Sequence, residues 1–207
     1  FFTEETSMLV ASIDIETTGL DLETCDILQF AAVLDDLSNP VPLQNLPKFE
    51  AFFTKRSYSG HPYAMSMHSE MLKKIDHAMK QNIEVCPTTG ARFMPLEDLP
   101  TAFASFLLQN GYNTEGKGKI YVNVAGKNVA MFDLPWLKAK IKDWGPIYFL
   151  NRVIDPAILY FDVQTDSKLP DMSKCLERAG LSGDVPHTAL EDALIVLKLL
   201  RKKLHKN

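Results

Sequence analysis

A chain of 207 residues, with 46% hydrophobic and 23% charged residues, has the composition of a globular protein and can bury one sizeable core. We expect a single domain over residues 1–207, because nothing in the sequence requires a second one. The net charge of −4 argues against a protein that binds long nucleic acid by positive charge alone. It leaves open an acidic pocket in which metal ions supply the local positive charge.

The cysteines and the apolar stretches indicate the cellular compartment in which we expect the protein. Cys25, Cys86 and Cys175 are widely spaced and form no Cys-x-x-Cys pair, so neither a disulfide framework nor a zinc site is indicated. The longest apolar stretches, near residues 146–161 and 189–200, are interrupted by charged residues, so we predict no membrane span. We also expect no signal peptide. An intracellular, cytoplasmic protein fits these features.

The first part of the chain predicts three strands. The apolar run 8–13 leads into Asp14 and Glu16 and stops at a Thr-Thr-Gly turn. Residues 27–34 and 49–55 are the next strand candidates. Short connections between these strands favour an antiparallel meander.

The rest of the chain alternates helices with strands. Strands are predicted over residues 120–124 and 152–156, and residues 86–95 and 111–119 are predicted loops. The predicted helices are 64–81, 96–109, 133–142, 170–179 and 188–204. This order predicts an α/β fold with a five-stranded mixed sheet, in which the last two strands lie parallel to the first.

A stripe of apolar side chains at helical spacing marks the first predicted helix. Met67, Met71, Ile75 and Met79 recur every fourth residue. We interpret this stripe as a core-facing surface rather than as part of a cofactor site.

Asp14 and Glu16 are the first candidates for a chemical role. Because side chains two apart on a strand share a face, both carboxylates point the same way, with Cα atoms roughly 7 Å apart. Like charges so close favour a cation between them, and oxygen ligands suit Mg²⁺ or Mn²⁺ better than zinc. The alternative is an acidic strand end in solvent.

Two further aspartates and a histidine lie near the ends of later elements. Asp133 opens a predicted helix, where an aspartate also serves as an N-cap. Asp192 lies one turn inside the last helix, where the helix dipole favours an acidic residue. His187, five residues before Asp192, is either a polar loop residue or a group that accepts a proton from water at neutral pH.

Taken in order, these residues resemble the DEDDh 3′-to-5′ exonucleases, a family that includes polymerase proofreading subunits, ribonuclease T and oligoribonuclease. The resemblance covers almost the whole chain. It rests on Asp-Ile-Glu-Thr-Thr-Gly-Leu from Asp14, Asn-x-x-x-Phe-Asp-Leu-Pro from Asn128 and His-x-Ala-x-x-Asp-Ala from His187. It implies a ribonuclease H-like fold and hydrolysis of single-stranded DNA or RNA from the 3′ end to 5′-mononucleotides.

The resemblance also implies a role for each acidic residue. Asp14, Glu16 and Asp192 would hold one of two Mg²⁺ or Mn²⁺ ions, and Asp14 would bridge to the second. Asp133 would bind that second ion directly or through water, and His187 would be the general base. In this two-metal scheme, ions about 4 Å apart clamp the scissile phosphate.

Contacts to the terminal nucleotide are implied in the same way. Thr17 would contact the 3′ hydroxyl, Leu20 would lie against the base, and the pair Met67 and His68 would lie beside the nucleotide. The alternatives are plain turn packing for Thr17 and Leu20, and an exposed helical position for His68.

The motif around Asp133 departs from the family pattern. Many proofreading relatives have His-Asn four residues before the aspartate, whereas here Lys127 and Asn128 precede it and Asn128 lies five residues away. Asn128 is an expected substrate contact or a supporting residue of the site, and Lys127 becomes a candidate for a phosphate contact. Phe132 is a substrate contact or a core residue.

Two alternatives to a general exonuclease stay open. One is an oligoribonuclease-like enzyme limited to short RNA. The other is a catalytically idle module that binds nucleic acid or a partner on the same fold. The expected partners are single-stranded DNA or RNA 3′ ends and no membrane; the motifs indicate neither a polymerase partner nor self-association, and they do not distinguish DNA from RNA.

Overall fold

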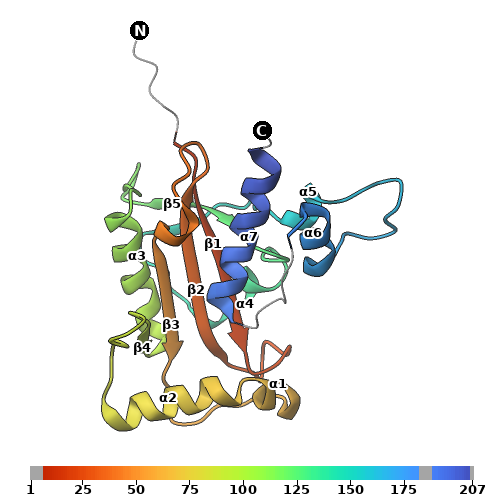
Figure 1. The fold of residues 1–207 in the computed structure, drawn as a ribbon. Helices are drawn as coiled ribbons and strands as arrows, with labels where there is room; N and C mark the ends of the chain where they lie inside the picture. The colour runs from red at the N-terminus through yellow and green to blue at the C-terminus, as the bar shows by residue number, and fades with distance from the viewer. Residues whose placement is uncertain (1–6, 182–187, 206–207) are drawn as a thin grey trace.

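A six-stranded mixed sheet forms the centre of the computed structural model, which describes residues 7–181 and 188–205 (Figure 1). The strand order is β4-β3-β2-β1-β5-β6. The strands are β1 (Leu9–Thr17), β2 (Ile27–Asp36), β3 (Lys48–Phe53), β4 (Arg92–Met94), β5 (Ile120–Ala125) and β6 (Ile147–Phe149). β2 pairs antiparallel with β1 and β3, while β5 pairs parallel with β1 and with β6. The predicted meander of the first three strands and the parallel pairing of β5 with β1 are therefore confirmed.

The prediction of a strand over residues 152–156 is wrong. The last strand is β6, at 147–149, and Ile154 makes only an isolated parallel bridge to Ala125. Pro156 instead begins the short helix α5 (Pro156–Leu159), and the Asp155 side chain caps it by accepting a hydrogen bond from the Ala157 N–H at 2.8 Å. An aspartate followed by proline is a helix start, and that local signal outweighs the apolar pattern before it.

The prediction of a loop over residues 86–95 also misses a strand. β4 spans three residues and pairs parallel with β3, so the sheet has six strands where five were predicted. Strands this short carry too few residues to display the alternation that marks a strand in the sequence.

Helices cover both faces of the sheet. The remaining helices are α1 (Pro62–Met67), α2 (Ser69–Gln81), α3 (Leu99–Gln109), α4 (Asp133–Lys140), α6 (Met172–Ala179) and α7 (Ala189–Leu204), with short 3-10 turns at Leu43–Asn45 and Leu96–Asp98. Apolar side chains of α3 and α4 share a core with one face, and those of α6 and α7 share a core with the other. α1 and α2 lie across one end of the sheet (Figure 1). Among the described residues, no helix is both long and apolar enough to cross a membrane.

The helix predicted over 64–81 is divided in two at His68. This residue ends α1 and begins α2, with φ −93° and ψ 20°. Ile75 is fully buried, and Met71 packs against the same small core, but Met67 and Met79 are exposed. The apolar stripe therefore faces the core only in its middle, because α2 lies across the end of the sheet and contacts it over a short stretch.

An ion pair fixes α7 to β2. The Arg201 guanidinium donates two hydrogen bonds to the fully buried Asp35 carboxylate, from Nε to Oδ2 at 2.6 Å and from Nη2 to Oδ1 at 2.5 Å. A third donor, Nη1, bonds to the Val41 carbonyl oxygen. A paired, two-point contact of this kind sets where α7 lies along the sheet.

We predict that Asp35→Ala lowers the free energy of unfolding by about 3 kcal/mol, because the largely buried Arg201 guanidinium loses its partner. Urea denaturation followed by circular dichroism measures this loss. Lys198→Ala removes an exposed charge from the same helix and should change the free energy by less than about 0.5 kcal/mol. Equal losses in the two variants would contradict the assignment.

Candidate active site

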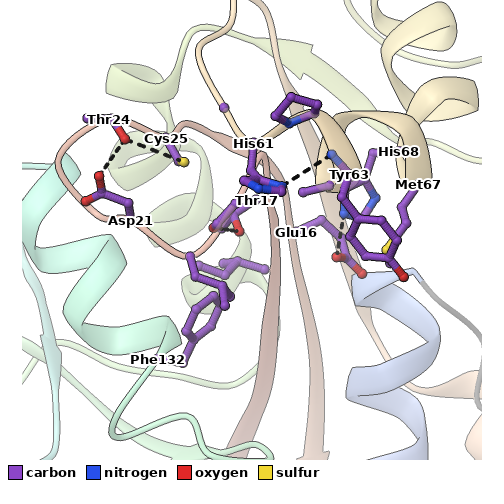
Figure 2. A pocket seen from close by; sticks show the side chains of 16 residues that line it. Glu16, Thr17, Asp21, Thr24, Cys25, His61, Tyr63, Met67, His68 and Phe132 are labelled. Atoms are coloured by element: carbon purple, nitrogen blue, oxygen red, sulfur yellow. Dashed lines mark hydrogen bonds and ion pairs between the residues drawn. The ribbon is translucent and has the colours of Figure 1, made fainter.

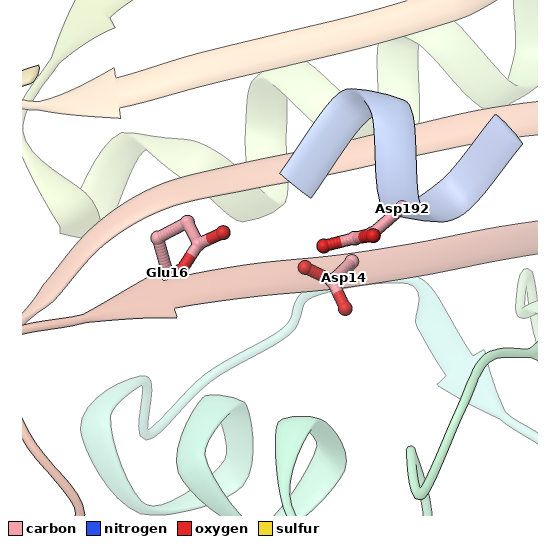
Figure 3. Close-up of side chains that lie close together, drawn as sticks. All are labelled: Asp14, Glu16 and Asp192. Atoms are coloured by element: carbon pink, nitrogen blue, oxygen red, sulfur yellow. The ribbon is translucent and has the colours of Figure 1, made fainter. Parts of the chain in front are cut away.

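β1 and α7 bring three carboxylates together. Asp14 and Glu16 lie on the β1 face that packs against α7, and Asp192 approaches them from the first turn of α7 (Figure 3). One oxygen from each of the three carboxylates lies within 4.8 Å of the other two. Oxygens that share one divalent cation lie about 4 to 5 Å apart at most, so this donor set fits such an ion.

The start of α7 places Asp192 in that cluster. Thr188 is the N-cap, and its Oγ1 accepts a hydrogen bond from the Glu191 N–H at 3.4 Å. The Asp192 N–H bonds to the Thr188 carbonyl oxygen at 3.0 Å. The Thr188 hydroxyl also donates to the Glu191 Oε2 at 2.7 Å, so the side chains of this Thr-x-x-Glu start are paired as well. The local sequence thus explains why the helix begins where Asp192 can reach β1.

Asp133 reaches the site from the other face of the sheet. It is the first residue of α4 and not its N-cap, which is Phe132, so the capping alternative for Asp133 is wrong. Its Oδ1 accepts a hydrogen bond from the Ile15 N–H at 3.0 Å, and only 2% of the residue is exposed. Asp133 lies outside the three-oxygen cluster but lines the same cavity of about 370 Å³ as Asp14 and Asp192.

Burial and the charges of neighbouring carboxylates raise the pKa of Asp14, Glu16 and Asp133. The pKa of Asp14 is well above its ordinary value because of burial and the charges of Asp133, Glu16 and Asp192, with Lys127 acting in the opposite direction. In the metal-free protein Asp14 therefore holds its proton more tightly than an exposed aspartate does.

The same causes act on the neighbouring groups. Burial, followed by the charges of Asp192 and Asp133, raises the pKa of Glu16 to about 8. The pKa of Asp133 rises to about 7, mainly through burial, although the peptide N–H of Ile15 partly offsets the shift. A bound divalent cation would reverse these shifts, because it stabilises the ionised carboxylates.

His68 lies beside Glu16. Its Nε2 is 3.4 Å from the Glu16 Oε2, and only 8% of the residue is exposed (Figure 2). The alternative of an exposed helical histidine is therefore wrong. His68 lies at the break between α1 and α2, where the chain changes direction. This change of direction places its side chain beside Glu16.

A larger cavity, of about 800 Å³, adjoins the carboxylates. Thr17, Leu20, Met67, His68 and Phe132 all line it, so the structure brings together five of the six expected substrate contacts (Figure 2). Leu20 is 85% exposed, which excludes simple core packing for that side chain. The Thr17 hydroxyl donates a hydrogen bond to the Gly19 carbonyl oxygen at 2.6 Å, so its proton is engaged within the turn itself.

Two further lining residues escaped the sequence analysis. His61 is the N-cap of α1, and its Nδ1 accepts a hydrogen bond from the Tyr63 N–H at 3.3 Å. The Tyr63 side chain is largely exposed at the cavity. The signal was present, because His61 followed by Pro62 is a capping residue before a proline in the first turn.

Asn128, the sixth expected contact, lies in the turn after β5. Its φ of 54° is left-handed, and its N–H donates to the Asp155 Oδ2 at 2.8 Å. Gly126 begins this turn so close to β1 that a Cβ there would lie 2.9 Å from the Ile13 carbonyl oxygen. The turn places Lys127 and Asn128 on the wall of the carboxylate cavity. His187, the expected general base, lies outside the described residues.

No protein-family model matches the sequence, and no curated protein matches it either. Solved structures do match the fold. Cell-death related nuclease 4 (CRN-4) superposes with a TM-score of 0.61 at 15% identity, over 95% of this chain and 63% of that one. The chain thus spans less than two thirds of CRN-4.

A second match covers nearly all of both chains. The nuclease domain of 3′hExo, a DEDDh family member crystallised with rAMP, superposes with a TM-score of 0.63 at 14% identity, over 98% of this chain and 94% of that one. The two matches show that this chain shares the fold of these two nucleases, as the resemblance of its motifs implied.

We predict that Glu16→Gln raises the melting temperature of the metal-free protein at alkaline pH. An unfolded chain releases the Glu16 proton near pH 4.5, whereas the folded chain holds it to about pH 8. Stability from this group is therefore present below pH 4.5 and is lost as the pH rises towards 8. Glutamine does not titrate and so removes that loss. The melting temperature of Glu16→Gln minus that of the wild type should therefore grow from pH 5 to pH 9, as measured by calorimetry in EDTA.

Exposed Glu23 provides the matched control, since Glu23→Gln should leave the pH dependence unchanged. Adding Mn²⁺ should stabilise the wild type more than Glu16→Gln. Parallel stability curves for all three proteins would contradict the placement of Glu16 in a buried acidic cluster.

Proposed function

We propose that this protein is a metal-dependent 3′-to-5′ exonuclease that hydrolyses single-stranded DNA or RNA ends to 5′-mononucleotides. The observation that carries the proposal is the convergence of Asp14, Glu16 and Asp192 on one point, with Asp133 in the same cavity. The nuclease fold supports it, because the cluster lies on that fold at residues that match the family motifs.

Two divalent ions, Mg²⁺ or Mn²⁺, are the proposed cofactors. Asp14, Glu16 and Asp192 would hold one, and Asp14 with Asp133 the other. The all-carboxylate donor set favours these hard ions over zinc. When bound, they would lower the pKa of a water molecule and stabilise charge on the scissile phosphate and on the leaving 3′ oxygen.

His187 is the proposed general base. It directly precedes the N-cap of α7, the helix whose first turn carries Asp192. A neutral imidazole there would accept the proton of the attacking water. His68 contacts Glu16, and we assign it to the neighbourhood of the terminal nucleotide, where it also orients that carboxylate.

The larger cavity is the proposed site of the terminal nucleotide. Its volume of about 800 Å³ is that of a site for one small ligand, and it adjoins the carboxylates through Glu16 and His68. Exposed Leu20 and Met67, together with Phe132, offer apolar surface to an unpaired base. Because the Thr17 hydroxyl donates its proton to Gly19, its oxygen can still accept a hydrogen bond from a 3′ hydroxyl.

We predict that 5′-labelled DNA or RNA incubated with Mn²⁺ shortens from its 3′ end as a ladder of labelled products. Asp14→Ala should abolish this ladder because it removes the ligand assigned to both ions, while circular dichroism still reports a folded protein. EDTA should abolish it as well. Denaturing gels of DNA and RNA substrates run in parallel give the measurement and the preference between them.

Two substrates control for other activities. Circular single-stranded DNA should stay intact, because it has no end to enter the cavity. Oligonucleotides from two to thirty residues distinguish a general exonuclease, which shortens all of them, from an enzyme limited to short RNA, which shortens only the shortest RNAs. If the wild type binds strands but shortens none with any divalent metal, the chain is a binding module and the proposal is wrong.

We predict that His187→Ala lowers kcat by about 10² to 10⁴, because a positioned base contributes this much. The Mn²⁺ concentration for half-maximal activity should change little, since the imidazole is assigned to proton transfer and not to metal binding. His205→Ala, at the exposed far end of α7, is the control. A loss of Mn²⁺ affinity that matches the loss of kcat would make His187 a ligand.

A further inference from the structure

Gln29 is a fully buried polar side chain next to the carboxylate cluster. It lies on β2 directly opposite Glu16 in the β1–β2 register and has no exposed surface. Its amide is bonded at both ends. Nε2 donates to the Glu50 Oε1 at 2.7 Å, and Oε1 accepts from the Ala189 N–H at 3.2 Å.

The second of these bonds reaches the start of α7. Ala189 is the first residue of that helix, and its N–H is one of the groups that a helix cannot satisfy internally. Thr188 caps the Glu191 N–H and so leaves the Ala189 N–H to another acceptor. Gln29 provides that acceptor and thereby ties the first turn of α7 to the middle of the sheet.

Glu50 helps to fix the orientation of the Gln29 amide. Burial raises the pKa of Glu50, whereas the charge of Lys74 and the hydrogen bond from Gln29 lower it. In its ionised form the carboxylate only accepts hydrogen bonds, so it requires the NH₂ end of the Gln29 amide. The backbone N–H of Ala189 donates only, so it requires the oxygen end. Both partners therefore select the same orientation of the amide. If the amide were reversed, neither of these two hydrogen bonds could form.

We infer that Gln29, held by Glu50, is a positioning residue that sets the Asp192 carboxylate against Asp14 and Glu16. Asp192 lies one turn beyond the N–H that Gln29 binds. A shift of that turn moves one of three oxygens that must stay within reach of a single ion. The consequence for catalysis rests on the proposed function, whereas the consequence for cation binding rests on the cluster itself.

The inference is tested by Mn²⁺ binding to the whole chain, measured by titration calorimetry without nucleic acid. Gln29→Met keeps the side-chain length and removes both hydrogen bonds. We expect it to weaken Mn²⁺ binding by about 10- to 100-fold, the usual effect of removing a group that orients a ligand. Tyr160→Phe is the matched control, because the Tyr160 hydroxyl bonds to the Leu199 carbonyl oxygen near the other end of α7.

An exchange of the two side chains gives a second test. Gln29→Glu places two carboxylates against each other, so it should weaken Mn²⁺ binding. The double variant Gln29→Glu with Glu50→Gln again pairs one amide with one carboxylate, but the amide now donates from position 50. The carboxylate at position 29 still offers an oxygen to the Ala189 N–H. We expect this double variant to recover Mn²⁺ affinity to within a few-fold of the wild type.

The outcomes separate this inference from the proposed function. Mn²⁺ affinity that is unchanged in Gln29→Met, or reduced no more than in Tyr160→Phe, overturns the inference. If Gln29→Met does not fold, the exchange decides, and a double variant that binds no better than Gln29→Glu also overturns it. A wild type that binds Mn²⁺ but cuts no strand contradicts the proposed function alone.

Discussion

Repulsion among buried carboxylates is the constraint on which the rest of this structure depends. Burial raises the pKa of Asp14, Glu16 and Asp133, and the charges of neighbouring carboxylates, Asp192 among them, raise it further. A fold without a use for this cluster gains stability by replacing any of these residues. A bound cation would compensate for this repulsion, and a rigid scaffold keeps the three oxygens of Asp14, Glu16 and Asp192 together.

The scaffold meets that requirement by fixing α7 at both ends. Arg201 and Asp35 form a buried ion pair near the C-terminal end, and Gln29 bonds to the Ala189 N–H at the N-terminal end. The Ile15 N–H performs a related task for Asp133, since it binds the carboxylate that arrives with α4. Elements from both faces of the sheet thus meet at the middle strand, where β1 supplies the first two carboxylates.

Sequence reasoning succeeded at several local signals but overlooked two others, the helix starts at Asp155-Pro156 and His61-Pro62. The helix start at Thr188 and the meander of the first three strands follow from capping residues, apolar runs and short connections. The strand at 147–149 and the break at His68 do not, because a three-residue strand has no visible period and a helix break depends on what the helix packs against. Among the expected substrate contacts, the structure places Leu20 and His68 beside one cavity, although their roles remain proposals.

The sequence by itself determined that Asp14 and Glu16 share a face, and it singled out the residues that we propose carry the chemistry. Backbone geometry enforces that alternation within a strand whatever surrounds it. Only the tertiary structure decided that Asp192 lies beside them and that Gln29 reaches α7. Those contacts depend on the register of β1 with β2 and on how α7 lies against the sheet, and both are set by the packing of side chains far apart in the chain.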